Sequence, residues 1–401
     1  MSDDVRTSAG VPAGAIDEPE LEPRVRDGLR DTVWVFLGVR TLLFVLSAVG
    51  VGLIPLPFDQ PTSVPGWPAR PPDRGWEAVF TATERQDALW YLRLATDGYR
   101  EDDLSAAFFP MYPAIVRTVA LVPGVGPLGA ALLVSNAAAF GALLMLHALT
   151  RLELGRAAAR RTILFIALFP TAFFLLSPYS ESLFLLLSVS AFWFARRDRW
   201  GWAAVLGASA ALTRSVGVLL LLGLGAEALR QWRSEGRSPL PRLTAAAAVI
   251  LGPLLYGAYW LAAFGNVWAP LDAQRAWQRQ TSFFLLTVWR AVDAAWDFRF
   301  YYLLDVLVVA FAITGVVLAV RHVASPYSVY AIASILLPLT FPFPDRPLLS
   351  MPRFVLVVFP AFWGFAAVAA RRPGVATAVV AGGAAGYGIL TVLFVNWHYI
   401  F

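Results

Sequence analysis

The sequence predicts an all-α polytopic membrane protein with about eleven transmembrane helices. Hydrophobic residues make up 58% of the 401-residue chain and charged residues only 15%. The mean hydropathy is +0.62. A typical soluble domain is about 45–50% apolar and about 25% charged, so this composition excludes an ordinary soluble protein. We therefore expect a bundle of helices that crosses a bilayer.

Apolar segments mark the expected helices, since a helix needs about 20 apolar residues to cross the hydrocarbon core. The segments are 32–54, 127–149, 162–178, 181–195, 201–213, 215–229, 243–264, 301–320, 327–341, 354–370 and 375–395. Some of them, such as 201–213, are short for a span. The number of spans is therefore approximate.

The chain has no lysine. Apart from its three histidines, arginine is therefore its only basic residue. Half of the arginines, 16 of 32, fall before the first expected span or in the loops after every second span. They are Arg24, Arg26, Arg30, Arg151, Arg156, Arg160, Arg161, Arg196, Arg197, Arg199, Arg230, Arg233, Arg237, Arg321, Arg371 and Arg372. Loops rich in arginine stay on the cytoplasmic side, so we expect an integral protein of the cell membrane with a cytoplasmic N-terminus. No basic surface with interleaved aromatics is evident, and no nucleic-acid partner is expected.

Three regions follow from this topology. Residues 1–31 are rich in charged residues, Pro and Gly, and are expected to form a disordered cytoplasmic tail. Residues 32–401 form the membrane domain, in which 55–106 is the first outer loop. Two further outer segments, 264–300 and 342–353, are expected to converge with it over one cavity.

The first outer loop is expected to carry interfacial helices. Residues 84–97 have an apolar face, while Gln86, Arg93 and Asp97 group on the other face, and Gly98 is a stop signal. A second short helix is expected to start near Pro113. Both are too short to span a bilayer.

Asp87 is the main catalytic candidate. A carboxylate at the outer membrane face is able to accept the proton of a hydroxyl nucleophile as a general base. Asp97 and Tyr99 are candidates for polar contacts to a sugar. The alternative for Asp87 is a favourable charge at a helix start, and for Asp97 a turn that ends the helix.

Three further residues are candidates for substrate binding. Arg214 and Arg353 lie at the outer ends of expected spans, where guanidinium groups suit a phosphate. Glu181 opens another span. The alternatives are a snorkelling or interfacial arginine, and a helix start in which Ser180 is the N-cap and Glu181 lies in the first turn.

Metal and cofactor sites are not expected. The chain has no cysteine, and its three histidines, His147, His322 and His398, lack metal-ligand spacing. The acidic run 101–103 offers oxygen ligands for a divalent ion, but a solvated charge cluster is the favoured interpretation.

Five ordered segments carry a family resemblance. They are QDALWYLRLATDGY, AFFPMYPAIVR, SPYSESLFLLL, LTRSVGVLLL and MPRFVLVVFP. Together they resemble the PIG-V family of mannosyltransferases, and the first outer loop resembles the wider GT-C class. A resemblance of this kind implies a GT-C-like fold, a polyprenyl-phosphate-mannose donor and transfer on the outer side of the membrane. It maps the family's catalytic acid onto Asp87, although Gln86 stands where the family commonly has Trp.

The sequence thus favours a membrane mannosyltransferase, with Asp87 as general base in an inverting displacement. Its partners are expected to be the donor lipid, membrane lipids and a glycolipid, glycan or protein acceptor, and the composition is compatible with a bacterial homologue. Two alternatives remain. One is a lipid-linked sugar flippase or transporter, and the other a noncatalytic scaffold of a glycosylation complex. A cavity that holds Asp87 with Arg214 or Arg353 would oppose the scaffold.

Overall fold

The computed structural model describes residues 18–53, 64, 75–236, 238–276, 279–296, 300–398 and 400. Every regular element within these ranges is a helix. Of the expected tail, residues 1–17 lie outside the described ranges, and the first helix begins at Glu18. Most of the proline-rich part of the first outer loop also lies outside them.

The α-helices are α1 (Glu18–Leu53), α2 (Glu77–Thr81), α3 (Asp87–Asp97), α4 (Met111–Ala120), α5 (Pro127–Leu154), α6 (Arg156–Ala167), α7 (Glu181–Arg196), α8 (Trp200–Thr213), α9 (Leu220–Glu235), α10 (Leu240–Ala247), α11 (Leu251–Phe264), α12 (Ala269–Ala276), α13 (Phe284–Trp296), α14 (Phe300–Val320), α15 (Ser325–Leu339), α16 (Met351–Leu356), α17 (Phe359–Ala369) and α18 (Pro373–Val395). Short 3₁₀ helices are η1 (Leu104–Ala107), η2 (Ala172–Leu175), η3 (Ser215–Leu219) and η4 (Ala248–Ile250).

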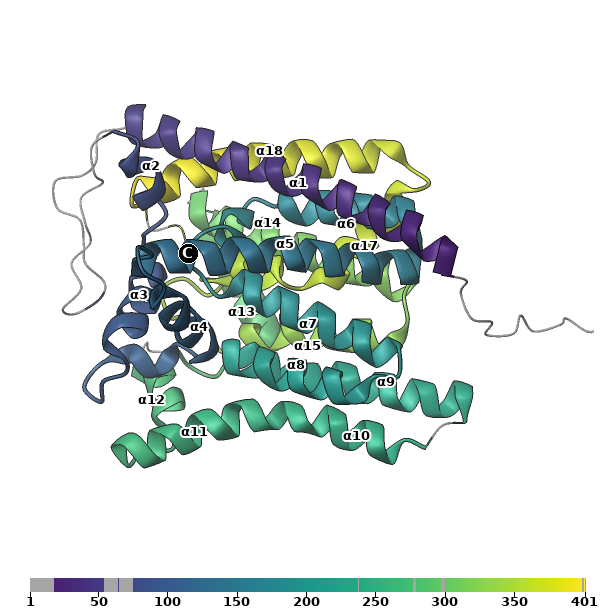
Figure 1. The fold of residues 1–401 in the computed structure, drawn as a ribbon. Helices are drawn as coiled ribbons and strands as arrows, with labels where there is room; N and C mark the ends of the chain where they lie inside the picture. The colour runs from purple at the N-terminus through teal and green to yellow at the C-terminus, as the bar shows by residue number, and fades with distance from the viewer. Residues whose placement is uncertain are drawn as a thin grey trace, which may run out of the picture.

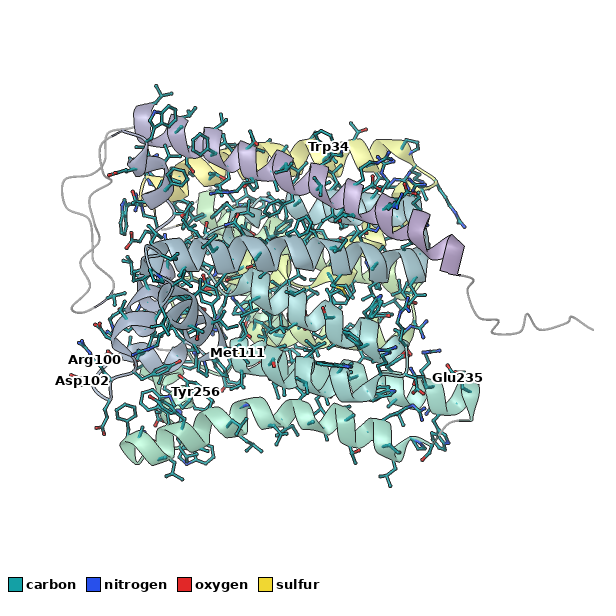
Figure 2. All side chains as sticks on the ribbon, viewed as in Figure 1. Trp34, Arg100, Asp102, Met111, Glu235 and Tyr256 are labelled. Atoms are coloured by element: carbon teal, nitrogen blue, oxygen red, sulfur yellow. The ribbon has the colours of Figure 1, made fainter. Side chains whose placement is uncertain are left out.

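The long helices run side by side, and α2, α3, α4 and α12 gather at one end of the bundle (Figure 1). We call this the α3 end. Arg100 and Asp102 lie at the α3 end, whereas Glu235, at the end of α9, lies at the opposite end (Figure 2). Helix α1 packs against α5 and α18. One end of the bundle is therefore covered by short helices, as the sequence predicts for the first outer loop.

Five of the described helices are long and apolar enough to cross a membrane: 26–53, 127–154, 240–264, 301–320 and 373–395. Helices α15 and α17 are apolar but shorter. The protein is an integral membrane protein of all-helical type. Each expected apolar segment coincides with one or more helices, but the number of spans stays a prediction.

Several helices end before they reach the α3 end. Helix α6 ends at Ala167, and the chain then passes through a buried irregular segment before α7 begins at Glu181. Pro170 and Pro178 lie in this segment, and proline cannot donate the hydrogen bond that would continue a helix. Helix α8 likewise ends at Thr213. These interruptions place polar side chains beneath α3 instead of at the bilayer surface.

Helices α14 and α17 approach closely at a pair of glycines. A Cβ atom at Gly364 would lie 2.0 Å from the carbonyl oxygen of Gly315, and one at Gly315 would lie 2.4 Å from that of Ala361. Small residues allow such backbone contact between membrane helices. The crossing therefore requires glycine at both positions.

We predict that Gly364→Ala destabilises the protein by about 1–3 kcal/mol, because the added methyl group forces α14 and α17 apart. The melting temperature of the purified protein in detergent measures the effect. Gly388→Ala in α18 is the control, since a Cβ there meets no atom within 4 Å. Equal melting temperatures for the two variants would contradict the close packing.

Candidate functional site

Asp87 is the first residue of α3, and a strained turn precedes it. Gln86 has φ +52° and ψ −121°, a region that residues other than glycine rarely adopt, at a cost of about 1–3 kcal/mol. The Gln86 side-chain amide donates to the carbonyl oxygen of His398 at 3.0 Å. Contacts with the C-terminal segment thus compensate for the strain and fix where α3 begins.

Arg85 anchors the same turn. Its side chain is buried, donates from Nε to the carbonyl oxygen of Val395 at 3.2 Å, and lies 4.4 Å over the ring of Trp397. Burial lowers the pKa of Arg85 to about 10, so the guanidinium remains charged at neutral pH. Tyr179 donates its hydroxyl to the carbonyl oxygen of Arg85 at 2.8 Å. The start of α3 is therefore tied to both α18 and the segment before α7.

Four charged side chains form one connected network beneath α3. Arg353 donates from Nη1 to Asp87 Oδ2 and from Nε to Glu181 Oε1, the latter at 2.7 Å. Arg214 Nη1 lies 2.6 Å from the same Glu181 oxygen. Two carboxylates and two guanidinium groups balance in charge. We call these four residues the ionic network.

The elements explain why these residues meet. Glu181 opens α7, Arg214 lies in extended conformation between α8 and η3, and Arg353 lies in the first turn of α16. Helix α16 is held in place by Thr171, whose hydroxyl donates to the carbonyl oxygen of Pro352 at 2.9 Å. Each residue comes from an interruption between helices. The sequence predicts all four as candidates, and the structure brings them together.

Burial differs sharply within the ionic network. Side-chain exposure is 0% for Glu181, 10% for Arg214 and 11% for Arg353, but 32% for Asp87. Glu181 Oε2 and Arg214 Nε are buried and have no hydrogen-bond partner among the described residues. Oδ1 of Asp87 accepts no hydrogen bond from the described part of the chain. The network therefore keeps an accessible carboxylate oxygen and an unused arginine donor.

Asp87, Arg214 and Arg353 line one cavity of about 110 Å³. The other lining residues are Tyr91, Ala107, Phe108, Phe109, Thr213, Ser215, Gln274, Arg279, Ser350 and Phe354. They include members of all three outer segments. Backbone hydrogen bonds from Gln280 to Pro342 and from Ser282 to Thr340 join the second and third segments. The expected convergence of the outer loops over one cavity is confirmed.

Ser180 takes the N-cap position of α7 and Glu181 lies in its first turn, as expected, but the side-chain cap is not formed. The backbone of Ser180 is helical (φ −83°, ψ −7°), and its side chain makes no cap hydrogen bond. Its hydroxyl lies 2.8 Å from the hydroxyl of Tyr91 and accepts from Arg214 Nη1 at 3.3 Å. These partners occupy the oxygen that would otherwise cap α7. Ser180 and Tyr91 thus belong to the surroundings of the ionic network, and spacing in the sequence did not reveal this.

Asp97 and Tyr99 lie outside the cavity. Asp97 is exposed and pairs with Arg100 at 3.3 Å. Tyr99 donates to the carbonyl oxygen of Phe108 at 2.7 Å and packs against the rings of Tyr256 and Trp260. Phe108 lines the cavity, so the Tyr99 hydroxyl contacts the cavity wall at the backbone carbonyl of Phe108. Their predicted contact to a sugar stays untested.

A buried ion pair that the sequence did not reveal holds the wall of the cavity. Arg93 on α3 has a side chain with 0% exposure and pairs with Asp103, so this member of the polar face expected for α3 is enclosed. The backbone N–H of Ser105 also donates to Asp103 at 2.7 Å. Burial opposes ionisation of Asp103, but its hydrogen bonds with Ser105 and Arg93 outweigh this and lower its pKa. The three residues of the acidic run therefore differ: Asp103 is paired with Arg93, whereas Glu101 and Asp102 are exposed.

We predict that Asp103→Asn lowers the stability by about 3–5 kcal/mol at neutral pH, since it leaves the buried Arg93 charge without its carboxylate. The lowered folded-state pKa means that the wild-type advantage is fully present above an unfolded-state pKa of about 3.9. It is lost as the pH falls through the folded-state value. Melting temperature against pH measures this, and Asp102→Asn is the matched exposed control. A loss of the same size in both variants would contradict a specific pair.

Comparisons with known proteins identify a family and a similar fold. The profile of the family described as Mannosyltransferase (PIG-V) matches residues 60–264, just over half of the chain. No curated protein matches the sequence. The fold is similar to the crystal structure of ArnT from Cupriavidus metallidurans bound to undecaprenyl phosphate. The TM-score is 0.52 at 14% identity over 92% of this chain and 77% of that chain. The expected GT-C-like fold is therefore confirmed in outline.

Proposed function

The chain belongs to the PIG-V mannosyltransferase family, and from this premise we propose that it transfers mannose from a polyprenyl-phosphate-mannose donor to an acceptor hydroxyl. The protein is a membrane glycosyltransferase. The observation that carries the finer proposal is the cavity in which an accessible carboxylate, Asp87, lies beside two arginines, Arg214 and Arg353. The acceptor is a glycolipid, a glycan or a protein.

Asp87 is the general base of the proposed reaction. Asp87 lines the cavity, Arg353 binds its Oδ2, and its Oδ1 accepts no hydrogen bond from the described residues. Asp87 takes the proton of the acceptor hydroxyl as the acceptor oxygen bonds to C1 of mannose. The bond between C1 and the phosphate oxygen breaks, and its electron pair leaves with the lipid phosphate. One displacement inverts the configuration at C1, and a phosphate leaving group needs no general acid.

Arg214 and Arg353 bind the phosphate of the donor and stabilise the charge that develops on it. The ionic network is neutral without a ligand, so a donor phosphate adds negative charge next to guanidinium groups that are already oriented. Arg214 lines the same cavity as Asp87, so its guanidinium group lies close to the proposed position of this phosphate. Glu181 holds both arginines in position through its ion pairs with them.

The donor in this proposal is a lipid, which agrees with the solved structure of similar fold, ArnT bound to undecaprenyl phosphate. Arginine-rich loops favour the cytoplasm for the end opposite α3. The proposed active site therefore faces the outer side of the cell membrane, and the N-terminus is cytoplasmic.

The rival functions are less well supported. A noncatalytic scaffold has no need of an open cavity with a carboxylate that keeps an unpaired oxygen. A flippase is expected to have its charged residues at the bilayer midplane. The ionic network instead lies beneath the short helices at one end of the bundle. A transferase accounts for both observations.

We predict that Asp87→Asn lowers the rate of mannose transfer by about 10²–10⁴-fold, because the amide cannot accept the acceptor proton. Transfer of labelled mannose from a short-chain polyprenyl-phosphate-mannose to native membrane acceptors measures this, at matched amounts of folded protein. Donor binding is expected to persist.

Asp102→Asn is the control for this experiment, since Asp102 is exposed and outside the cavity. Undiminished transfer by Asp87→Asn would remove Asp87 from the role of base. No transfer by the wild type, with a suitable acceptor present, would favour the flippase or scaffold.

We predict that Arg214→Lys raises KM for the donor and lowers kcat/KM by about 10–100-fold. Lysine keeps the charge but loses the planar fork that contacts both Glu181 and a phosphate. Steady-state kinetics with varied donor measure both constants. Arg117→Lys on α4 is the control, because Arg117 is exposed and does not line the cavity. Unchanged constants in Arg214→Lys would argue against a phosphate contact.

A further inference from the structure

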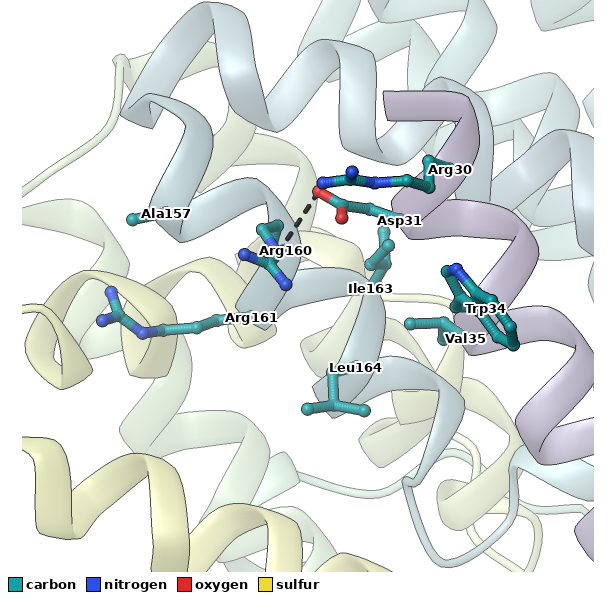
Figure 3. Close-up of a pocket in the computed structure, with 9 residues that line it drawn as sticks. All are labelled: Arg30, Asp31, Trp34, Val35, Ala157, Arg160, Arg161, Ile163 and Leu164. Atoms are coloured by element: carbon teal, nitrogen blue, oxygen red, sulfur yellow. Dashed lines mark ion pairs between the residues drawn. The ribbon is translucent and has the colours of Figure 1, made fainter. Parts of the chain in front are cut away.

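A second cavity lies at the opposite end of the bundle, between the first turns of the membrane part of α1 and the start of α6. It measures about 670 Å³. Arg30 and Trp34 of α1 and Arg160, Arg161 and Leu164 of α6 line it (Figure 3). We call it the arginine cavity. It shares no lining residue with the cavity beneath α3.

On both walls of the arginine cavity, a charged residue lies near the end of the bundle and an apolar residue lies one helical turn further in. Helices α1 and α6 both run from this end into the bundle, so a residue four positions later lies about 6 Å deeper. Trp34 lies one turn below Arg30, and Leu164 lies one turn below Arg160. Each wall therefore presents a guanidinium group above an apolar side chain. This is the order of phosphate and acyl chain in a phospholipid.

The charge of the arginine cavity is positive. Three arginines and one carboxylate, Asp31, are among its lining residues, which gives a net charge of +2. Asp31 is already engaged, since its Oδ2 lies 3.3 Å from Arg160 Nε and 3.7 Å from His147 Nε2. Arg30 and Arg160 are exposed. The remaining positive charge of the arginine cavity attracts a further anion.

The two walls are fixed relative to each other. Asp27 of α1 pairs with Arg156 of α6 at 2.9 Å, one turn above the arginine cavity. Helix α1 also approaches α5 closely, since a Cβ at Gly28 would lie 2.9 Å from Nδ1 of His147. The cavity is thus part of the packing between three helices. It is more than a set of arginines extended into solvent.

We propose that the arginine cavity binds the phosphate of an anionic membrane phospholipid. Arg30 and Arg160, which are both exposed and lie close together in Figure 3, contact the phosphate, and the acyl chain runs along Trp34 and Leu164. Arginine suits this role because its planar fork binds phosphate oxygens in pairs. Trp34 is 71% exposed, which suits an indole ring at the headgroup level of a bilayer. This apolar surface below the charges favours a lipid over free phosphate, and basic pockets between membrane helices bind anionic headgroups.

The test is native mass spectrometry of the full chain in detergent, titrated with dioleoyl phosphatidylglycerol. The wild type is expected to bind this lipid more tightly than dioleoyl phosphatidylcholine. Arg30→Gln/Arg160→Gln is expected to weaken phosphatidylglycerol binding by about 10- to 30-fold. The matched control is Arg371→Gln/Arg372→Gln, which removes two exposed arginines from the turn between α17 and α18 and is expected to change binding less than about twofold.

Three results would overturn the proposal: equal weakening in the site and control variants, no preference for phosphatidylglycerol over phosphatidylcholine, or full displacement of the lipid by inorganic phosphate. The last would indicate a site for a free anion. Circular dichroism and melting temperature check that the variants fold. If the double variant does not fold, Arg30→Gln alone gives the same test, since Arg30 is exposed and makes no ion pair within the described ranges.

Discussion

The buried carboxylate of Glu181 is the constraint on which the arrangement of the site depends. One of its oxygens binds both Arg214 and Arg353, and its side chain has no exposed surface. A charge buried in this way is destabilising by several kcal/mol unless a partner compensates for it. Arg353 in turn binds Asp87. Helix α7, the junction after α8, α16 and the start of α3 are therefore held together by one set of charges.

Interrupted helices make this possible within an otherwise apolar bundle. A continuous span would carry Arg214 on a helix surface facing lipid or packed side chains. The break after Thr213 instead turns the guanidinium toward Glu181 and Ser180. Prolines in the segment between α6 and α7 have the same effect on the other side. The polar groups thus satisfy each other and need no exposure to hydrocarbon.

The two carboxylates of the ionic network, Glu181 and Asp87, differ in how deeply they are buried. Glu181 is enclosed and has a structural role toward the arginines, whereas Asp87 keeps a free oxygen and about a third of its side-chain surface. The strained Gln86 and the buried Arg85 hold α3 at this position against the C-terminal segment. Two carboxylates of the same chemistry thus have different environments, and only Asp87 has substantial exposed surface.

Local signals in the sequence were sufficient for the all-helical membrane fold, for α3 with its stop at Gly98, and for the choice of Asp87, Glu181, Arg214 and Arg353. These signals are hydropathy, helix stop residues and isolated charges between apolar runs. Each extends over only a few residues, so it can be identified from the sequence alone. Contacts between distant segments decided the rest. Arg353 and Asp87 are 266 residues apart, and Arg353 and Glu181 are 172 apart.

Periodicity states which face of a helix is polar but not which segment will meet it. For this reason Arg93 was expected on an open polar face, while the structure buries it against Asp103. Ser180 was expected to cap α7, but its hydroxyl binds Tyr91 and Arg214. By itself, the sequence determined the membrane helices and the charged residues between them. Only the tertiary structure decided which charges pair, because the cost of burying each one depends on the partner that packing brings to it.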